Sequence, residues 1–332
     1  MKLKKLLICF LLIFLFVACV PFTAGLASAD NSEAIYLGGM SSGFTLNTRG
    51  ATVIGVGDVI TENGLVSPAN EAGIVANDVI LSIDGIEVNT AKDVEKIISD
   101  GLIKQMLVKT ESGEKNVNIT PAKDISGKYR LGIFIRDEIN GIGTVTFFKG
   151  NKVATLGHSV YDPSGSIVEV TSGDIFCSKI TGYIRGKRGN PGELKGLFSE
   201  SKPYAKVIKN DKTGIYGELI NGIPFENTKQ IETGEARPGG ASIMSTISGN
   251  TVKEYEISIV KTDYLNSDNK NFVIRINDSQ LLSETGGIVQ GMSGSPIIQD
   301  GKLVGAVTHV FINDPTRGFG ISISEMLKSL EK

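Results

Sequence analysis

Residues 291–307 read Gly291-Met292-Ser293-Gly294-Ser295-Pro296-Ile297-Ile298-Gln299-Asp300-Gly301-Lys302-Leu303-Val304-Gly305-Ala306-Val307. A serine between glycines is followed by two apolar runs, and the Asp300-Gly301 pair between these runs predicts a β-hairpin. A nucleophilic serine needs a sharp turn that exposes its Oγ, and glycine permits the backbone angles of such a turn. The alternative is an ordinary glycine-rich turn before a hairpin. Ser293 is therefore a candidate nucleophile that needs a base elsewhere in the chain.

His158 is the candidate general base. The chain has two histidines, and His158 stands where the apolar run 153–156 gives way to a loop. The serine hydroxyl is a poor nucleophile at neutral pH, so a base has to take its proton. A solitary histidine in a β protein is more often structural or at the surface. The serine loop downstream favours the catalytic interpretation.

A carboxylate that orients the imidazole would complete a catalytic triad. Asp278 closes the strand predicted for residues 272–277, while Asp162 and Asp174 lie closer to His158 in the sequence. An aspartate at the end of a strand is more often a turn residue. Spacing alone does not choose among the three.

The composition indicates a mainly β protein of two ordinary domains. The 332 residues include 40 glycines, 7% aromatic residues and no tryptophan, and strand-like runs outnumber helical ones. The net charge is −2, and no block rich in lysine and arginine follows the first five residues, so we expect no nucleic-acid binding. No cluster has metal-ligand spacing, so we expect neither a metal nor another cofactor.

Residues 1–29 have the layout of a targeting segment. Three lysines precede an apolar run over residues 6–20, and Ala27-Ser28-Ala29 offers a cleavage site of small residues. The pattern predicts a signal peptide, and the alternative is a retained membrane anchor. Lipidation of Cys19 is the weaker interpretation. Either way, the segment predicts export across the cytoplasmic membrane.

Cleavage after Ala29 would leave Cys177 as the only cysteine of the mature protein. No disulfide could then form within the chain, which suggests a bacterium whose envelope proteins do not depend on disulfides. The apolar neighbours of Cys177 predict a buried structural thiol rather than a nucleophile.

Residues 35–123 carry the pattern of one small domain. A short helix ending at Gly73, a strand with an Asp84-Gly85 turn, and helical spacing of apolar residues between 90 and 100 follow one another. Together they resemble a PDZ domain. In PDZ domains a peptide adds as an extra strand, and the N–H groups of a glycine-rich loop bind its C-terminal carboxylate.

The matching loop in this chain would consist of Ser41, Ser42, Gly43 and Phe44. It departs from the usual Gly-Leu-Gly-Phe at two positions. Recognition of an internal or N-terminal peptide segment therefore stays an alternative to recognition of a C-terminal carboxylate.

Residues 124–332 show short strands separated by glycine and asparagine turns, which suits two small barrels or a sandwich. The serine loop resembles Gly-Asp-Ser-Gly-Gly-Pro, the nucleophile loop of trypsin-like peptidases, which fold as a double β-barrel. The resemblance implies an oxyanion hole from the N–H groups of Gly291 and Ser293. It also implies that the strand after the hairpin borders the substrate cleft, with three subsite residues, none of them the base: Thr308, His309 and Val310.

Three longer runs make a closer resemblance. They are Thr155-Leu156-Gly157-His158, Asn190-Pro191-Gly192-Glu193-Leu194-Lys195-Gly196 and Thr285-Gly286-Gly287-Ile288-Val289-Gln290-Gly291-Met292-Ser293-Gly294-Ser295-Pro296. With the preceding PDZ pattern, they resemble the family of stage IV sporulation protein B, a sporulation signalling serine peptidase of endospore-forming bacteria. Carried over residue by residue, the family implies His158 as base, Asp278 as orienting acid and Ser293 as nucleophile.

The family resemblance also implies a biological setting. Its members are secreted from the forespore into the space between the forespore and mother-cell membranes, and they cleave themselves near the N-terminus. They cleave a membrane-bound regulator of an intramembrane metalloprotease, which releases activation of the late mother-cell sigma factor. The expected partners are thus this protein substrate and a PDZ peptide ligand.

The sequence also allows two alternatives to a signalling peptidase. The first is a PDZ scaffold with an inactive peptidase domain, although all three residue types of a triad are present. The second is a general envelope quality-control protease, a family in which the PDZ domain usually follows the peptidase domain.

Overall fold

The structure is a computed structural model that describes residues 34–162 and 165–332. The predicted signal segment, residues 1–29, lies outside these residues. Within the described ranges, no helix is both long enough and apolar enough to span a bilayer. The described elements are mostly β-strands, with a few short helices.

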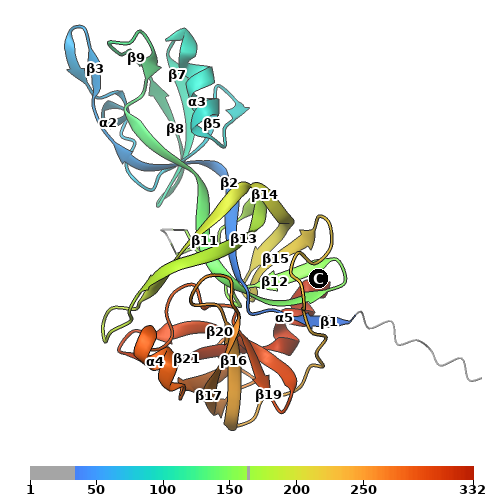
Figure 1. Cartoon of the computed structure of the whole chain (residues 1–332). Helices are drawn as coiled ribbons and strands as arrows, with labels where there is room; N and C mark the ends of the chain where they lie inside the picture. Colours follow the sequence, from blue (N-terminus) through green and yellow to red (C-terminus); the bar gives the residue numbers. More distant parts are fainter. Residues whose placement is uncertain (1–33, 163–164) are drawn as a thin grey trace, which may run out of the picture. The chain divides into compact units, whose positions relative to one another are not determined.

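A first antiparallel barrel closes through six described strands. The ring runs through β2, β11, β12, β15, β14 and β13, and pairing of β13 and β11 with opposite edges of β2 closes it (Figure 1). Phe44, Leu46, Val145 and Val153 pack in its core. The bounds are β2 (Ser41–Val56), β11 (Ile133–Lys149), β12 (Lys152–Thr155), β13 (Val170–Ile184), β14 (Glu193–Asp211) and β15 (Gly214–Leu219), with β1 (Ile35–Leu37) paired to the end of β11.

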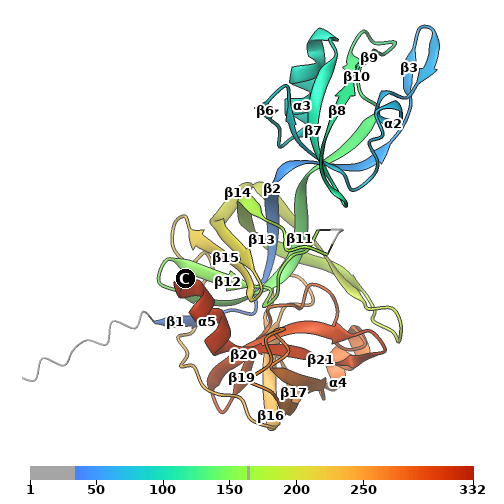
Figure 2. The same ribbon diagram turned by 180° about the vertical axis from the view of Figure 1, so that it is seen from behind.

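A second antiparallel barrel also closes through six described strands, in the order β16-β17-β18-β21-β20-β19. Figure 2 shows it in orange and red, with β16, β17, β19, β20 and β21 labelled. Its core includes Ile257, Phe272 and Ile297. The bounds are β16 (Gly239–Ser245), β17 (Lys253–Thr262), β18 (Phe272–Ile276), β19 (Pro296–Gln299), β20 (Lys302–Phe311) and β21 (Asp314–Ser322), with α4 (Ser279–Glu284) after β18 and α5 (Ile323–Glu331) last. The predicted hairpin is confirmed as β19 and β20, turned at Asp300-Gly301.

Along the chain, the PDZ elements lie between the part of β2 and the part of β11 that pair with each other in the first barrel. Their core gathers Val53, Ile74, Ile80 and Leu131. A capping box in which Thr90 and Asp93 each bond the other's backbone starts α3. The bounds are β3 (Val59–Thr61), β4 (Gly64–Val66), α2 (Pro68–Glu71), β5 (Val79–Ile83), β6 (Ile86–Glu87), α3 (Ala91–Ile97), the 3-10 helix η1 (Ile98–Asp100), β7 (Lys104–Thr110), β8 (Gly113–Ile119), β9 (Ala122–Lys123) and β10 (Tyr129–Arg130).

The structure corrects the predicted domain boundaries of 35–123 and 124–332. The first part of β2 pairs with β11 inside the barrel, while its last part pairs with β5 and β11 inside the PDZ domain. The PDZ domain therefore extends from the last part of β2 to the first part of β11 and interrupts the first barrel rather than preceding the peptidase domain. The sequence gives no break here because β2 is one continuous strand that serves both domains. The fold class, a PDZ domain with a trypsin-like double barrel, is confirmed.

Candidate active site

The loops that carry His158 and Ser293 pack against each other. His158 follows β12 of the first barrel, and Ser293 precedes β19 of the second. The contact is close at Gly294, where a Cβ would lie 2.1 Å from the Thr144 carbonyl oxygen and 2.5 Å from the Leu156 nitrogen. Gly294 also has a φ of 94°, so two constraints require glycine beside the serine.

The serine hydroxyl has a defined orientation. Ser293 is half-buried, and its Oγ donates to the Thr308 carbonyl oxygen at 2.7 Å. The residue after Thr308 is His309, whose ring lies against that of His158 with 4.6 Å between centroids. The structure thus gathers these four residues at one site. For attack, the hydroxyl has to turn from the Thr308 carbonyl toward the base, a rearrangement of the kind that substrate binding produces.

The His158 ring is in the tautomer that a general base needs. Its Nδ1 lies 2.8 Å from the Ser159 carbonyl oxygen. A carbonyl can only accept, so Nδ1 carries the proton and Nε2 is free to take one from the serine. Burial lowers the pKa of His158, and the hydrogen bond to Ser159 opposes that shift. The neutral, competent form is therefore favoured down to a lower pH than usual.

The candidate acids do not reach the imidazole. Among the described residues, the ring's hydrogen bond goes to the Ser159 carbonyl alone. Asp278 Oδ1 accepts instead from Leu281 N at 2.8 Å and caps α4. Asp174 pairs with Lys206 at 2.6 Å. In the remaining candidate, Asp162, Oδ1 accepts from Ser166 N. The orienting role of Asp278 thus stays a prediction from the family, without a contact that supports it.

The two predicted oxyanion donors are available. In the described part of the chain, neither Gly291 N nor Ser293 N donates to a protein atom, whereas Met292 N and Gly294 N bond Val289 O and Val307 O. Gly291 has a φ of 95°, which only glycine adopts readily. The turn therefore leaves its two oxyanion N–H groups without partners, as an oxyanion hole requires.

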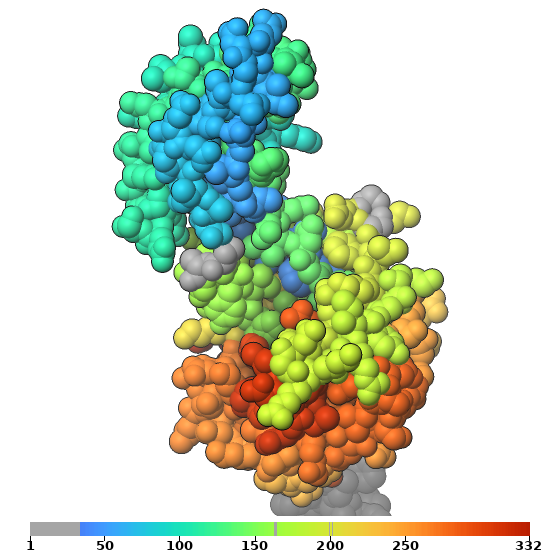
Figure 3. All heavy atoms as spheres, turned by 90° about the vertical axis from the view of Figure 1, so that its left-hand side faces the viewer, coloured from blue at the N-terminus to red at the C-terminus, as the bar shows by residue number. Residues whose placement is uncertain are grey.

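A long hairpin supports the oxyanion turn from outside. The tip between β13 and β14 donates from Gly186 N and Gly189 N to the carbonyls of Thr285 and Ile312, each at 2.8 Å. Figure 3 shows this yellow-green hairpin lying across orange and red atoms of the second barrel. Gln290, the residue before Gly291, donates from its backbone N–H to the Gly192 carbonyl oxygen and accepts at its own carbonyl oxygen from Leu194 N. The run of residues 190–196 thus meets the serine loop directly.

The predicted cleft residues Thr308, His309 and Val310 lie in β20. Among the described strands this segment pairs with β21 alone, since β19 pairs with β20 only up to Ala306. The other edge is open to an added strand, which suits substrate binding. His309 Nδ1 is buried and has no hydrogen-bond partner among residues 34–162 and 165–332. Burial, followed by the charges of His158 and Lys270, lowers the pKa of His309 to about 4.

The predicted PDZ loop is wrong. Ser41, Ser42, Gly43 and Phe44 lie inside β2 of the first barrel, with β11 on one side and β13 on the other. Their backbone groups are occupied by this ladder, so they cannot receive a peptide. A Cβ at Gly43 would lie 2.3 Å from the Phe198 ring, which explains this glycine by packing.

The structure instead places a groove between α3 and the start of β11. Val59, Val94 and Ile98 line it together with Ile133 and Ile135. Among the described strands, the segment Ile133–Arg136 pairs with β2 alone, so its other edge can accept a peptide strand. Leu131-Gly132, which directly precede this segment, match the central Leu-Gly of Gly-Leu-Gly-Phe. This match escaped the sequence analysis because the predicted domain ended at residue 123.

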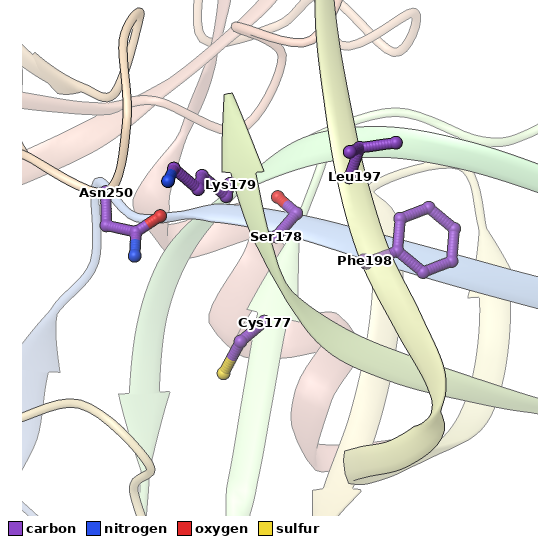
Figure 4. Close-up of a pocket in the computed structure, with 6 residues that line it drawn as sticks. All are labelled: Cys177, Ser178, Lys179, Leu197, Phe198 and Asn250. Carbon is purple, nitrogen blue, oxygen red and sulfur yellow. The ribbon is translucent and has the colours of Figure 1, made fainter. Parts of the chain in front are cut away.

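Cys177 is not buried, contrary to the prediction. It is exposed on β13 and lines a shallow pocket with Ser178, Lys179, Leu197, Phe198 and Asn250 (Figure 4). Alternation along the strand puts its neighbours Phe176 and Ser178 inside the barrel and Cys177 outside. Partial burial raises the pKa of the thiol, so a nucleophilic role remains unsupported.

The two barrels, the serine and histidine loops at their contact and the inserted groove define a serine peptidase with a PDZ domain. The family model described as SpoIVB peptidase S55 matches residues 127–327, and a PDZ domain model matches residues 65–109. The first match covers more than half of the chain. The chain belongs to the SpoIVB peptidase S55 family.

Three solved structures show weaker likeness. The active form of the Rv3671c protease from M. tuberculosis is 18% identical, with a TM-score of 0.37 over 58% of this chain and 74% of that one. The HtrA-type protease AlgW with a tripeptide is 14% identical, with a TM-score of 0.34 over 58% and 55%. The PDZ domain of an SdrC-like protein from Listeria monocytogenes is 22% identical, with a TM-score of 0.22 over 27% and 90%. No curated protein matches the sequence.

Proposed function

We propose that this serine peptidase is exported, cleaves itself, and cleaves one membrane-bound regulator of an intramembrane metalloprotease, which triggers late sigma-factor activation during sporulation. The observation that carries the proposal is the oxyanion turn with its two free N–H groups beside a half-buried serine and a neutral histidine. An inactive scaffold would have no need of that arrangement. Membership of the SpoIVB peptidase S55 family supports the sporulation setting.

The residues of the site perform peptide hydrolysis in two stages. Ser293 Oγ attacks the scissile carbonyl carbon while its proton passes to Nε2 of His158. The carbonyl oxygen gains a negative charge, which the N–H groups of Gly291 and Ser293 stabilise. His158 then gives its proton to the departing amine, and the C–N bond breaks. Water, deprotonated by the same ring, attacks the acyl group and frees Ser293.

The proposed setting is the space between the forespore and mother-cell membranes, which the N-terminal segment of residues 1–29 supports. Export would be followed by removal of this segment or by its retention as an anchor. Self-cleavage near the N-terminus would release the described part of the chain from the membrane. The PDZ groove would bind a peptide segment of the target or of the chain itself.

The test is a comparison of full-length wild type and Ser293→Ala expressed in an endospore-forming host. We expect wild type to shorten over time and Ser293→Ala to stay intact. Mass spectrometry of membrane-protein N-termini should reveal one or a few targets cut only by wild type. Cleavage of many unfolded envelope proteins would instead support a general quality-control protease. Normal shortening of Ser293→Ala would refute the nucleophile.

A further inference from the structure

Thr144 of β11 is buried between the two catalytic loops. Its Oγ1 donates to the Gly291 carbonyl oxygen at 2.9 Å, and its backbone N–H donates to the Ser293 carbonyl oxygen at 2.9 Å. It is 0% exposed, so water does not reach the residue to replace either bond. One residue of the first barrel therefore holds two carbonyls of the second barrel's nucleophile turn.

The carbonyl of Thr144 faces the opposite loop. It accepts from Thr155 Oγ1 at 2.7 Å and from Leu156 N at 3.4 Å. Leu156 has a φ of 71°, an unusual angle for a residue with a side chain, and lies two positions before His158. Thr144 thus contacts both the segment that leads to His158 and the loop that carries Ser293.

The two carbonyls that Thr144 holds flank the oxyanion donors. Gly291 O belongs to the peptide group between Gly291 and Met292. Ser293 O belongs to the peptide group between Ser293 and Gly294. The peptide group that contains Ser293 N lies between these two groups, and the peptide group that contains Gly291 N directly precedes the Gly291–Met292 group. Fixing both carbonyls sets the direction in which the two free N–H groups point. A misplacement of about 1 Å in such groups costs on the order of 100-fold in rate.

We propose that Thr144 is a positioning residue that sets the oxyanion donors and aligns His158 with Ser293 across the two barrels. The inference rests on the proposed function of this site as a peptidase. The lack of space around it supports the assignment, because a Cβ at Gly294 would meet the Thr144 carbonyl and a Cβ at Gly143 would lie 2.3 Å from Leu156 Cδ2. The catalytic loops therefore approach the backbone of residues 143 and 144 too closely for a side chain at Gly143 or Gly294.

The test uses three variants of the full chain: Thr144→Val, Thr144→Ser and Thr246→Val. Valine keeps the shape of threonine and removes the hydroxyl, while serine keeps the hydroxyl. Thr246 is the matched control, since it is also buried and its Oγ1 donates to a glycine carbonyl, Gly39 O, at 3.0 Å. The readouts are the rate and end point of labelling by a fluorophosphonate, kcat and KM on a fluorogenic peptide, and the unfolding temperature.

Thr144→Val should label and turn over roughly 10-fold to 100-fold more slowly, with KM within about twofold of wild type. Labelling should still reach the same end point, which separates a misaligned site from a misfolded fraction. Thr144→Ser should recover most of the rate, and Thr246→Val should match wild type in rate while losing as much thermal stability.

Two results would overturn the role of Thr144 while leaving the peptidase function intact. The first is an equal labelling rate in Thr144→Val and Thr246→Val. The second is slow turnover of Thr144→Val that a reduced labelling end point explains and that Thr144→Ser does not restore. Absence of labelling in folded wild type would refute the peptidase function itself, and the role of Thr144 with it.

Discussion

The rings of His158 and His309 lie 4.6 Å apart between centroids and are tilted by 33°. The chain's two histidines, far apart in the sequence, therefore meet at the active site. The burial that this contact contributes lowers the pKa of His158, and His309 itself has a pKa of about 4. Both rings are neutral at neutral pH. Within the described ranges, His158 Nδ1 donates to the Ser159 carbonyl, whereas His309 Nδ1 has no hydrogen-bond partner.

The first prediction concerns the acid limb of activity. His158 acts as a base only when neutral, so activity is lost as pH falls through its pKa, which burial holds below the usual 6.5. His309→Ala should expose His158, raise its pKa and move the acid limb of kcat/KM to higher pH. His309→Phe keeps the burial and should leave the limb near its wild-type position.

The readout is the fluorophosphonate labelling rate between about pH 4 and pH 8. An acid limb that moves to lower pH in His309→Ala would contradict the prediction. We also expect His309→Ala to cleave at least one peptide of a panel while changing which peptides are cut. Loss of all activity in a folded His309→Ala, with activity retained in His158→Ala, would show that the base is His309.

The second prediction separates two roles of Asp278. Its side chain caps α4, and asparagine caps a helix as well as aspartate does. Asp278→Asn should therefore keep both stability and turnover, while Asp278→Ala should lose about 1 kcal/mol of unfolding free energy. Chemical denaturation and peptide assays measure the two quantities. A stable Asp278→Asn protein without turnover would instead support the orienting role that the family implies.

The sequence predicted the features that depend on local pattern. The Asp300-Gly301 hairpin and the serine turn were predicted because glycine angles and strand alternation are encoded in neighbouring residues. Asp278 shows the limit, since an acid at a strand end and a helix cap look alike until the fold determines whether an imidazole is near. The predicted PDZ loop failed because β2 continues through both domains, so only pairing with distant β11 and β13 reveals which part serves the barrel.

The third prediction concerns the PDZ groove. Ile60 lines the groove and is 57% exposed, while Ile86 belongs to the same domain, does not line the groove and is also 57% exposed. Ile60→Glu should place a charge on the apolar groove and weaken capture of peptide segments, with cleavage of short peptides unchanged. Ile86→Glu is the control for the added charge and should behave as wild type.

Binding of a fluorescent peptide library to the full chain, scored beside cleavage of one short peptide, measures both effects. Equal loss of peptide binding in the two variants would mean that charge anywhere on this domain disturbs it. Loss of short-peptide cleavage in Ile60→Glu would show that the PDZ domain is needed to assemble the active site.

The central claim is that Ser293 is a nucleophile activated by His158, and labelling of the full chain by a fluorophosphonate tests it most directly. Wild type should be labelled at Ser293, as located by peptide mass spectrometry. Ser293→Ala should show no labelling, and His158→Ala should lose on the order of 10⁴-fold or more in turnover while remaining folded. Labelling of folded Ser293→Ala at the wild-type rate, or at a serine other than Ser293 in wild type, would contradict the assignment.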